Sequence, residues 1–143
     1  MFALEFRGRA GPSADGARRA RTSAPSQMHR TLLGARGVLA GIEALAGEEA
    51  VLESRVERRG DGTFVEDGTI RYGPSGMLSF VTVGAGCVGP SPVPGWQHGA
   101  VVWAVTEGEG WLAGARGLIT SNFTVSTDGE VVDNHVARLY LPA

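Results

Sequence analysis

The sequence predicts an all-β domain, a small antiparallel β-barrel of about eight strands in meander order. Short runs in which apolar and polar residues alternate recur along the chain, and turn sequences rich in glycine separate them. From Ala50 onward, no ten-residue stretch with helical periodicity lies between these runs. Closing the strands into a barrel also removes exposed sheet edges. We therefore expect the 143 residues to form one barrel domain.

The composition argues against several classes of protein. Hydrophobic residues make up 43% of the chain and charged residues 20%, as in ordinary globular domains. The N-terminus has no long apolar run, so we expect no signal peptide, no membrane partner and a cytoplasmic location. The single cysteine, Cys87, cannot form an internal disulfide. The net charge of -2 and the lack of aromatic residues within the cluster Arg18–Arg21 argue against a nucleic-acid partner.

The first fifty residues carry the weakest pattern. Residues 2–9 alternate as a half-buried strand does, and residues 18–23 could form a short polar edge strand. Within residues 31–47, apolar side chains recur every three positions, as in a helix. Three glycines in the same stretch would each destabilise a helix by about 1 kcal/mol relative to alanine. We therefore favour strand and turn for residues 31–47.

Beyond Ala50, strands and turns follow one another with clearer signals. The turn sequences are residues 60–62, 73–76 and 126–129. The expected strands are residues 50–57, 63–66, 69–72, 77–83, 100–106, 118–125 and 131–141. At least one further strand must come from the first fifty residues if the barrel is to close.

The glycine motif at residues 84–89 matches G-x-G-x-x-G and follows a predicted strand. A dinucleotide-binding turn also needs a helix directly after it, whose N-terminal amides bind the pyrophosphate. Pro90, Pro92 and Pro94 disfavour such a helix. We therefore expect an extended loop here and no nucleotide cofactor.

A second glycine motif joins two predicted strands at Gly108–Gly117. It resembles the G-x-G-x-(aromatic or aliphatic)-x-G-A-x-G turn of allene oxide cyclase-like and dirigent-like proteins. The resemblance covers about a third of the chain, and implies a calycin-like or allene oxide cyclase-like barrel with a hydrophobic cavity. It also implies lipophilic small-molecule ligands handled without a metal or redox cofactor. None of the catalytic positions of these families is matched here. In physical terms, the glycines permit close backbone approach at the barrel rim, and Trp111 and Leu112 could cover that end.

Two polar residues lie at positions where the alternation is otherwise apolar. Glu66 shares its strand face with Phe64 and Tyr72, unless a bulge at Gly68 turns it outward. An inward carboxyl there would have a raised pKa and could act as an acid or base near neutral pH. His135 shares its face with Val131 and other apolar residues. For both residues, the alternative is a hydrogen-bonded interior group with no catalytic role.

The connector from Gly84 to Gly99 is long and carries Trp96 and His98. Long loops often bind ligands or form lids, although this one could also be a surface loop stiffened by proline. Trp103 alternates with apolar residues and is expected in the core, whose walls would also enclose a ligand. The three histidines are far apart in sequence, and no C-x-x-C or H-E-x-x-H motif occurs. We expect no metal site.

The leading hypothesis is a cofactor-independent isomerase or cyclase that acts on a hydrophobic, natural-product or lipid-like small molecule inside the barrel. Three residues are candidates for acid–base catalysis: Glu66, His98 and His135. Four aromatic residues are candidates for the ligand-binding walls: Trp96, Trp103, Tyr72 and Phe64. A non-catalytic lipophile-binding barrel is the second hypothesis, and an oligomerising module with a filled interior is the third. A homodimer could form, since barrels of this size often dimerise.

Overall fold

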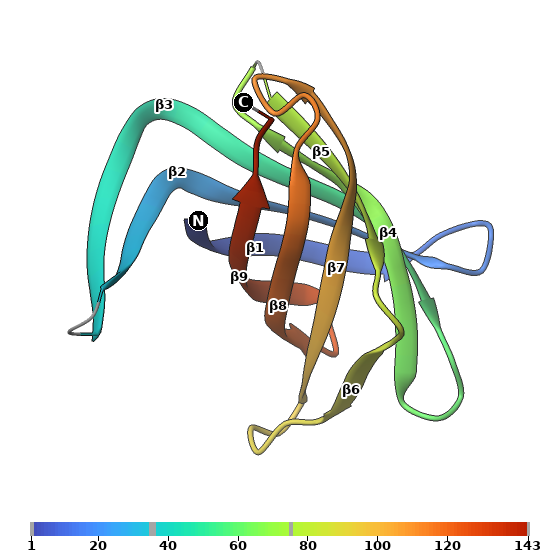
Figure 1. The fold of residues 1–143 in the computed structure, drawn as a ribbon. Coiled ribbons are helices and arrows are strands. Elements are labelled where there is room, and N and C mark those ends of the chain that lie inside the picture. Colours follow the sequence, from blue (N-terminus) through green and yellow to red (C-terminus); the bar gives the residue numbers. More distant parts are fainter. Residues whose placement is uncertain (1, 35–36, 75, 143) are drawn as a thin grey trace.

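The computed structural model is a closed barrel of eight antiparallel strands with one further strand, which confirms the predicted fold class (Figure 1). It describes the backbone of residues 2–34, 37–74 and 76–142, and the side chains of residues 4–24, 49–74 and 76–142. No helix occurs in this part of the chain, and so none that is long and apolar enough to cross a membrane.

Nine strands make up the sheet. They are β1 (Phe2–Pro12), β2 (Arg18–Gly34), β3 (Gly37–Arg58), β4 (Thr63–Tyr72), β5 (Gly76–Thr82), β6 (Gly86–Pro90), β7 (Trp96–Gly110), β8 (Arg116–Ser126) and β9 (Glu130–Tyr140). Around the barrel their order is β3-β2-β1-β9-β8-β7-β5-β4, and pairing of β3 with β4 closes the ring. Chain neighbours are therefore sheet neighbours, apart from the insertion of β6, as a meander requires.

Strand β6 occupies the connector that the sequence predicted as a loop. Its residues Gly86–Pro90 pair with the start of β4 and the start of β7. Strand β5 pairs with the opposite halves of the same two strands and ends at Thr82. The expectation of an extended loop was therefore wrong for this segment, because β6 fills the space that the short β5 leaves. The G-x-G-x-x-G motif therefore runs into a strand and not into the loop that was expected.

The first fifty residues supply three strands. Residues 2–9 lie in β1, with Leu4 and Phe6 buried as the alternation predicted. Residues 18–23 were expected at a sheet edge, but they lie in β2 and pair with both β1 and β3. The prediction of an edge strand was wrong because, in the closed barrel, β2 has a paired strand on each side. Residues 31–47 fall in β2, β3 and their connection, so strand and turn was the correct choice over helix; their side chains lie outside the described residues.

One end of the barrel interior is packed with apolar side chains. Its largest buried members are Phe6, Ile70, Leu78, Phe80, Trp103, Leu112 and Ile119. The rings of Phe80 and Trp103 are packed with centroids 4.4 Å apart. Leu112, in the β7–β8 turn, is buried and covers this end as expected, whereas Trp111 beside it is 53% exposed.

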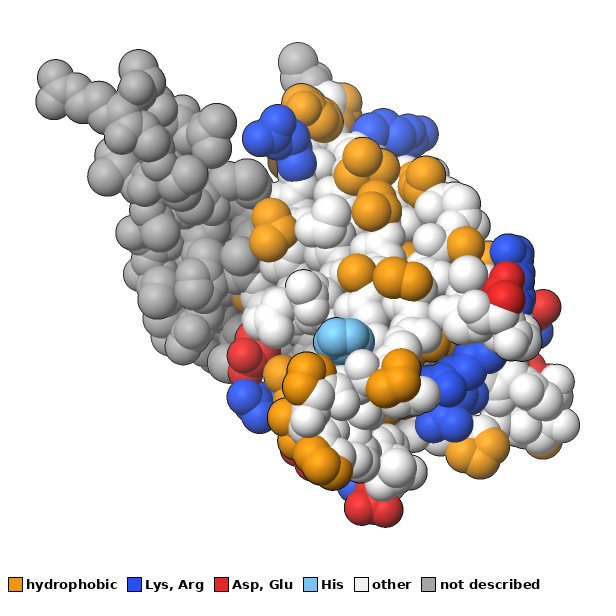
Figure 2. All heavy atoms as spheres, turned by 90° about the horizontal axis from the view of Figure 1, so that it is seen from below, with side chains coloured by type: hydrophobic (Ala, Val, Ile, Leu, Met, Phe, Trp, Pro, Cys, Tyr) orange, Lys and Arg blue, Asp and Glu red, His pale blue; other side chains and the backbone are white. Residues whose placement is uncertain are grey.

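Large apolar side chains are also exposed on the outer wall, among them Leu118, Val136 and Tyr140. Figure 2 shows one face of the molecule, on which the apolar side chains form separate groups divided by polar surface. The homodimer remains a prediction.

The glycine motif at Gly108–Gly117 permits close backbone approach at the barrel rim, as expected. A substitution at Gly108 tests this role. A Cβ atom there would collide with the carbonyl oxygen of Leu112. We expect Gly108→Ala to lower the free energy of unfolding by about 1–3 kcal/mol, the usual cost of overpacking. Denaturant unfolding measures this difference. Gly89→Ala is the matched control, since a Cβ at Gly89 meets nothing within 4 Å; equal effects of the two substitutions would contradict the prediction.

Candidate functional site

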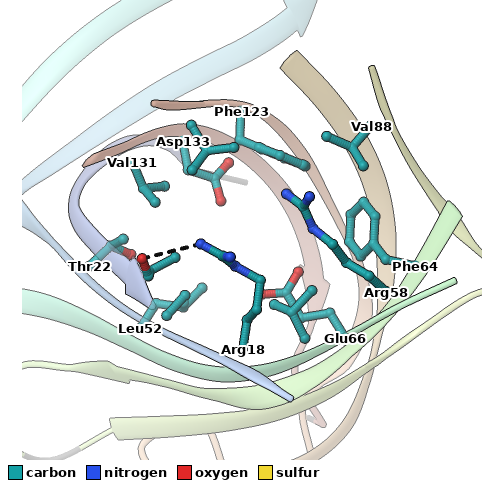
Figure 3. Close-up of a pocket in the computed structure, with 14 residues that line it drawn as sticks. Arg18, Thr22, Leu52, Arg58, Phe64, Glu66, Val88, Phe123, Val131 and Asp133 are labelled. Carbon is teal, nitrogen blue, oxygen red and sulfur yellow. Dashed lines mark hydrogen bonds between the residues drawn. The ribbon is translucent and has the colours of Figure 1, made fainter. Parts of the chain in front are cut away.

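A pocket of about 60 Å³ lies at the end of the barrel opposite the β7–β8 turn (Figure 3). Seven strands contribute to its wall. The residues that line it are Ala10, Arg18, Ala20, Thr22, Leu52, Val56, Arg58, Phe64, Glu66, Val88, Phe123, Val125, Val131 and Asp133. Nine of these residues are apolar, and the other five are two arginines, two residues with carboxyl groups and Thr22 with its hydroxyl.

The apolar lining residues are Ala10, Ala20, Leu52, Val56, Phe64, Val88, Phe123, Val125 and Val131. They form most of the wall, so a polar group in the pocket is set in largely apolar surroundings. Burial of that kind changes the acid–base properties of the side chains within it.

Glu66 points from β4 into the pocket and is only 9% exposed. The register between β3 and β4 runs past Gly68 without a shift, so the expected inward orientation is confirmed and the alternative of a bulge is wrong. The hydroxyl of Ser54 donates a hydrogen bond to its Oε1 at 2.5 Å. The pKa of Glu66 is raised to about 8, mainly by burial; the hydrogen bond from Ser54 opposes this shift, and the nearby charges of Asp133 and Asp67 contribute to it.

Asp133, on β9, is the second carboxyl group of the pocket and is held by two neighbours. Ser121 donates a hydrogen bond to its Oδ1 at 2.6 Å, and His135 Nε2 lies 2.9 Å from its Oδ2. With the ring proton on Nε2, His135 is a donor to this carboxylate. The negative charge of Asp133 in turn acts on Glu66.

His135 lies behind Asp133 rather than at the pocket surface. Its side chain is fully buried, and its ring packs against Phe6 and Trp103 with centroid distances of 4.4 and 5.0 Å. Its Nδ1 has no hydrogen-bond partner among the described residues. The geometry therefore makes His135 a positioning residue for Asp133.

Two arginines complete the pocket on the side that faces solvent. Arg58 is exposed and Arg18 is half-buried, and both side chains extend into the pocket beside Glu66 (Figure 3). Arg58 donates a hydrogen bond to Gln97 Oε1 at 3.0 Å, and Arg18 to the carbonyl oxygen of Ala10 at 3.5 Å. Partial burial and the charge of Arg18 lower the pKa of Arg58.

The structure brings together some of the residues that the sequence singled out. Glu66 and Phe64 line the pocket, while Trp103 and His135 are buried next to it. The indole N–H of Trp103 lowers the pKa of Glu66 slightly, although it forms no hydrogen bond within the usual distance. These four residues are therefore parts of one interior cluster.

Three other candidates lie away from the pocket. His98 is exposed, because it alternates with the inward-facing Val101 and Trp103 on β7. Trp96 is half-buried at the start of the same strand, and Tyr72 packs against the apolar core. None of the three lines the pocket.

The sequence analysis missed several polar groups of the site: Arg18, Ser54, Arg58, Ser121 and Asp133. Alternation alone could have found Asp133, which shares the inward face of β9 with Val131 and His135. It could also have found Arg58, which continues the inward series of Leu52 and Ser54 on β3.

Comparisons of the chain with protein-family models, with curated proteins and with solved structures found no match. Within the side chains that the structure describes, no three His, Cys, Asp or Glu residues are grouped as metal ligands.

Proposed function

We propose that this protein is a cofactor-independent isomerase or cyclase that acts on a hydrophobic small molecule held in the barrel pocket. The observation that carries the proposal is the pair of carboxyl groups in one largely apolar pocket. Glu66, whose pKa is raised to about 8, holds its proton at neutral pH, whereas Asp133 accepts two hydrogen bonds. Two carboxyl groups in such different surroundings suit a general acid and a general base.

The two groups could together move a double bond. Asp133 would take a proton from a carbon beside a substrate carbonyl, and the electrons of that C–H bond would form a C=C bond. Glu66 would donate its proton to the carbonyl oxygen, giving an enol. When the substrate has a C=C bond next to that carbon, the enol is a dienol. Return of the proton from Asp133 to the far carbon of the dienol, and of the enol proton to Glu66, would move the C=C bond into conjugation with the carbonyl with no atoms gained or lost. A pocket that holds the substrate in one orientation favours this transfer.

The volume of the pocket limits the part of the substrate that enters it. A cavity of about 150 Å³ can hold one benzene molecule, and this pocket is about 60 Å³. A compact molecule, or one end of a larger one, therefore suits it better than a folded lipid chain. A carrier that only binds such a molecule is the second candidate, since an apolar pocket with a polar end is also a binding site.

Glu66→Gln tests the catalytic proposal. Purified protein is incubated with a small-molecule extract of the source cells, and the extract is analysed by chromatography with mass spectrometry. An isomerase converts one compound into another of the same mass, and loss of the acid is expected to slow this by about 10²–10⁴-fold. Glu107→Gln is the control, since Glu107 is exposed on β7.

The outcomes separate the two candidates. Formation of an isomer by wild type and Glu107→Gln, but not by Glu66→Gln, would support the enzyme. A compound retained equally by all three proteins, with no isomer formed, would support the carrier and contradict the enzyme.

A further inference from the structure

We propose that Arg18 and Arg58 form an anion-binding site at the mouth of the pocket, and that the ligand is a compact monoanion with an apolar body about the size of one ring. The proposal shares the pocket with the proposed function and names the class of its ligand, but it requires no catalysis.

The first feature is that the two guanidinium groups lack a carboxylate partner. Neither arginine forms an ion pair with the side chains that the structure describes, and their hydrogen bonds go to the neutral oxygens of Gln97 and Ala10. By contrast, Arg19 on the outer wall is paired with Asp15 at 3.1 Å. Guanidinium groups bind carboxylates strongly, often through two parallel hydrogen bonds.

The second feature is the charge balance of the pocket lining. Two arginines contribute two positive charges and Asp133 contributes one negative charge, while Glu66 is neutral below about pH 8. The lining therefore carries one net positive charge at neutral pH. A monoanion would neutralise it and relieve the repulsion between Arg18 and Arg58, which already lowers the pKa of Arg58.

The third feature is an unused hydroxyl. Thr22 is 2% exposed and lines the pocket, and its Oγ1 has no hydrogen-bond partner among the described residues. Buried polar groups without a partner are rare in proteins because they cost free energy. A ligand oxygen in the pocket could accept or donate a hydrogen bond at this hydroxyl.

The fourth feature is the shape and lining of the remaining space. Phe64 and Phe123 meet edge to face, with centroids 5.7 Å apart, and both line the pocket. Aromatic walls of this kind suit a flat apolar group. The volume of about 60 Å³ is less than half of the roughly 150 Å³ that holds one benzene molecule, so the pocket takes in only part of a single ring and the rest lies at its mouth beside the arginines.

The test compares benzoate with benzamide, which has nearly the same shape but no charge. Amide chemical shifts of ¹⁵N-labelled protein are followed during titration at pH 7, which gives both the dissociation constant and the location of binding. We expect benzoate to bind about tenfold more tightly than benzamide. The largest shifts are expected near Thr22, Phe64 and Asp133.

Substitution of the two arginines tests whether they cause the preference for benzoate over benzamide. In the double variant Arg18→Gln with Arg58→Gln, the preference for benzoate should disappear while benzamide binding is unchanged. Arg19→Gln is the matched control and should behave as wild type. Thermal unfolding checks that each variant is folded, and the comparison of the two ligands on wild type stands even if the double variant does not fold.

The pH dependence gives a second measurement on wild-type protein. Glu66 faces Asp133 across the pocket lining and has Asp67 beside it on its own strand, and the arginines line the same pocket. When Glu66 loses its proton above about pH 8, the net positive charge of the lining is lost. The preference for benzoate should therefore weaken above pH 8 in wild type and stay constant in Glu66→Gln.

Three results would overturn the anion site: benzoate binding no tighter than benzamide, a preference that survives in the double variant, or shifts that map elsewhere on the barrel. Failure of the proposed isomerase or cyclase activity would give a different set of results. Tight benzoate binding with no isomer formed would retain the anion site and contradict only the enzyme.

Discussion

Replacing Glu66 with glutamine is expected to stabilise the protein above pH 8 and to flatten the dependence of its stability on pH. Burial raises the pKa of Glu66 from 4.5 to about 8. Between these values the folded protein holds a proton that the unfolded chain has released, so stability falls as pH rises. The stability associated with protonated Glu66 is fully present below about pH 4.5 and is lost as the pH rises to about 8. The shift corresponds to at most about 5 kcal/mol.

Thermal unfolding of wild type and Glu66→Gln between pH 5 and pH 9 measures this effect. Glutamine keeps the shape of the side chain and can still bond to Ser54, but it cannot ionise. For a domain of this length, each kcal/mol changes the melting temperature by about 2–4 °C. The difference in melting temperature between Glu66→Gln and wild type should increase as the pH rises. Parallel curves would show that Glu66 is ionised in the folded protein throughout, and Glu107→Gln should leave the wild-type curve unchanged.

Trp103→Ala is expected to lower the free energy of unfolding by about 3–5 kcal/mol, the usual cost of removing a large buried aromatic side chain. Trp103 has 0% exposure and packs against both Phe80 and His135. The substitution removes these contacts and leaves a cavity beside the ring of His135. Because His135 positions Asp133, we expect the substitution to change the pocket as well as the core.

Urea unfolding compares this variant with Trp111→Ala, which removes the same side chain from a site that is 53% exposed. We expect the exposed substitution to cost less than about 1 kcal/mol. Similar losses for the two variants would mean that the core does not depend on Trp103. Trp103→Phe keeps much of the apolar contact and should lie between them.

Alternation of apolar and polar residues predicted which side chains face the barrel interior. Leu4 and Phe6 in β1 and Glu66 in β4 are buried as their positions indicated. The period of a strand is two residues, so the inward face can be read from a short segment without knowledge of its partners. The same rule could not place residues 84–99, because strand β6 forms only where β5 ends and leaves two neighbours unpaired.

The contacts within the site depend on the register between paired strands, and not on the alternation within one strand. Ser54 and Glu66 belong to different strands and meet because β3 pairs Val56 with Glu66, which sets Ser54 on the same face one step away. Ser121 likewise meets Asp133 through the pairing of β8 with β9. Residues on one face of neighbouring strands interact diagonally as well as directly. The sequence contains no local signal for these pairings.

The sequence by itself determined that the chain is an antiparallel barrel, where most of its turns lie and that Glu66 faces inward. These properties follow from local chemistry, namely turn residues, β-branched residues and alternation. Only the tertiary structure decided that Asp133, Arg18 and Arg58 share a pocket with Glu66, and that His98 lies outside it. Closure of the barrel brings strands from both ends of the chain side by side, and the pocket exists only where their inward faces converge.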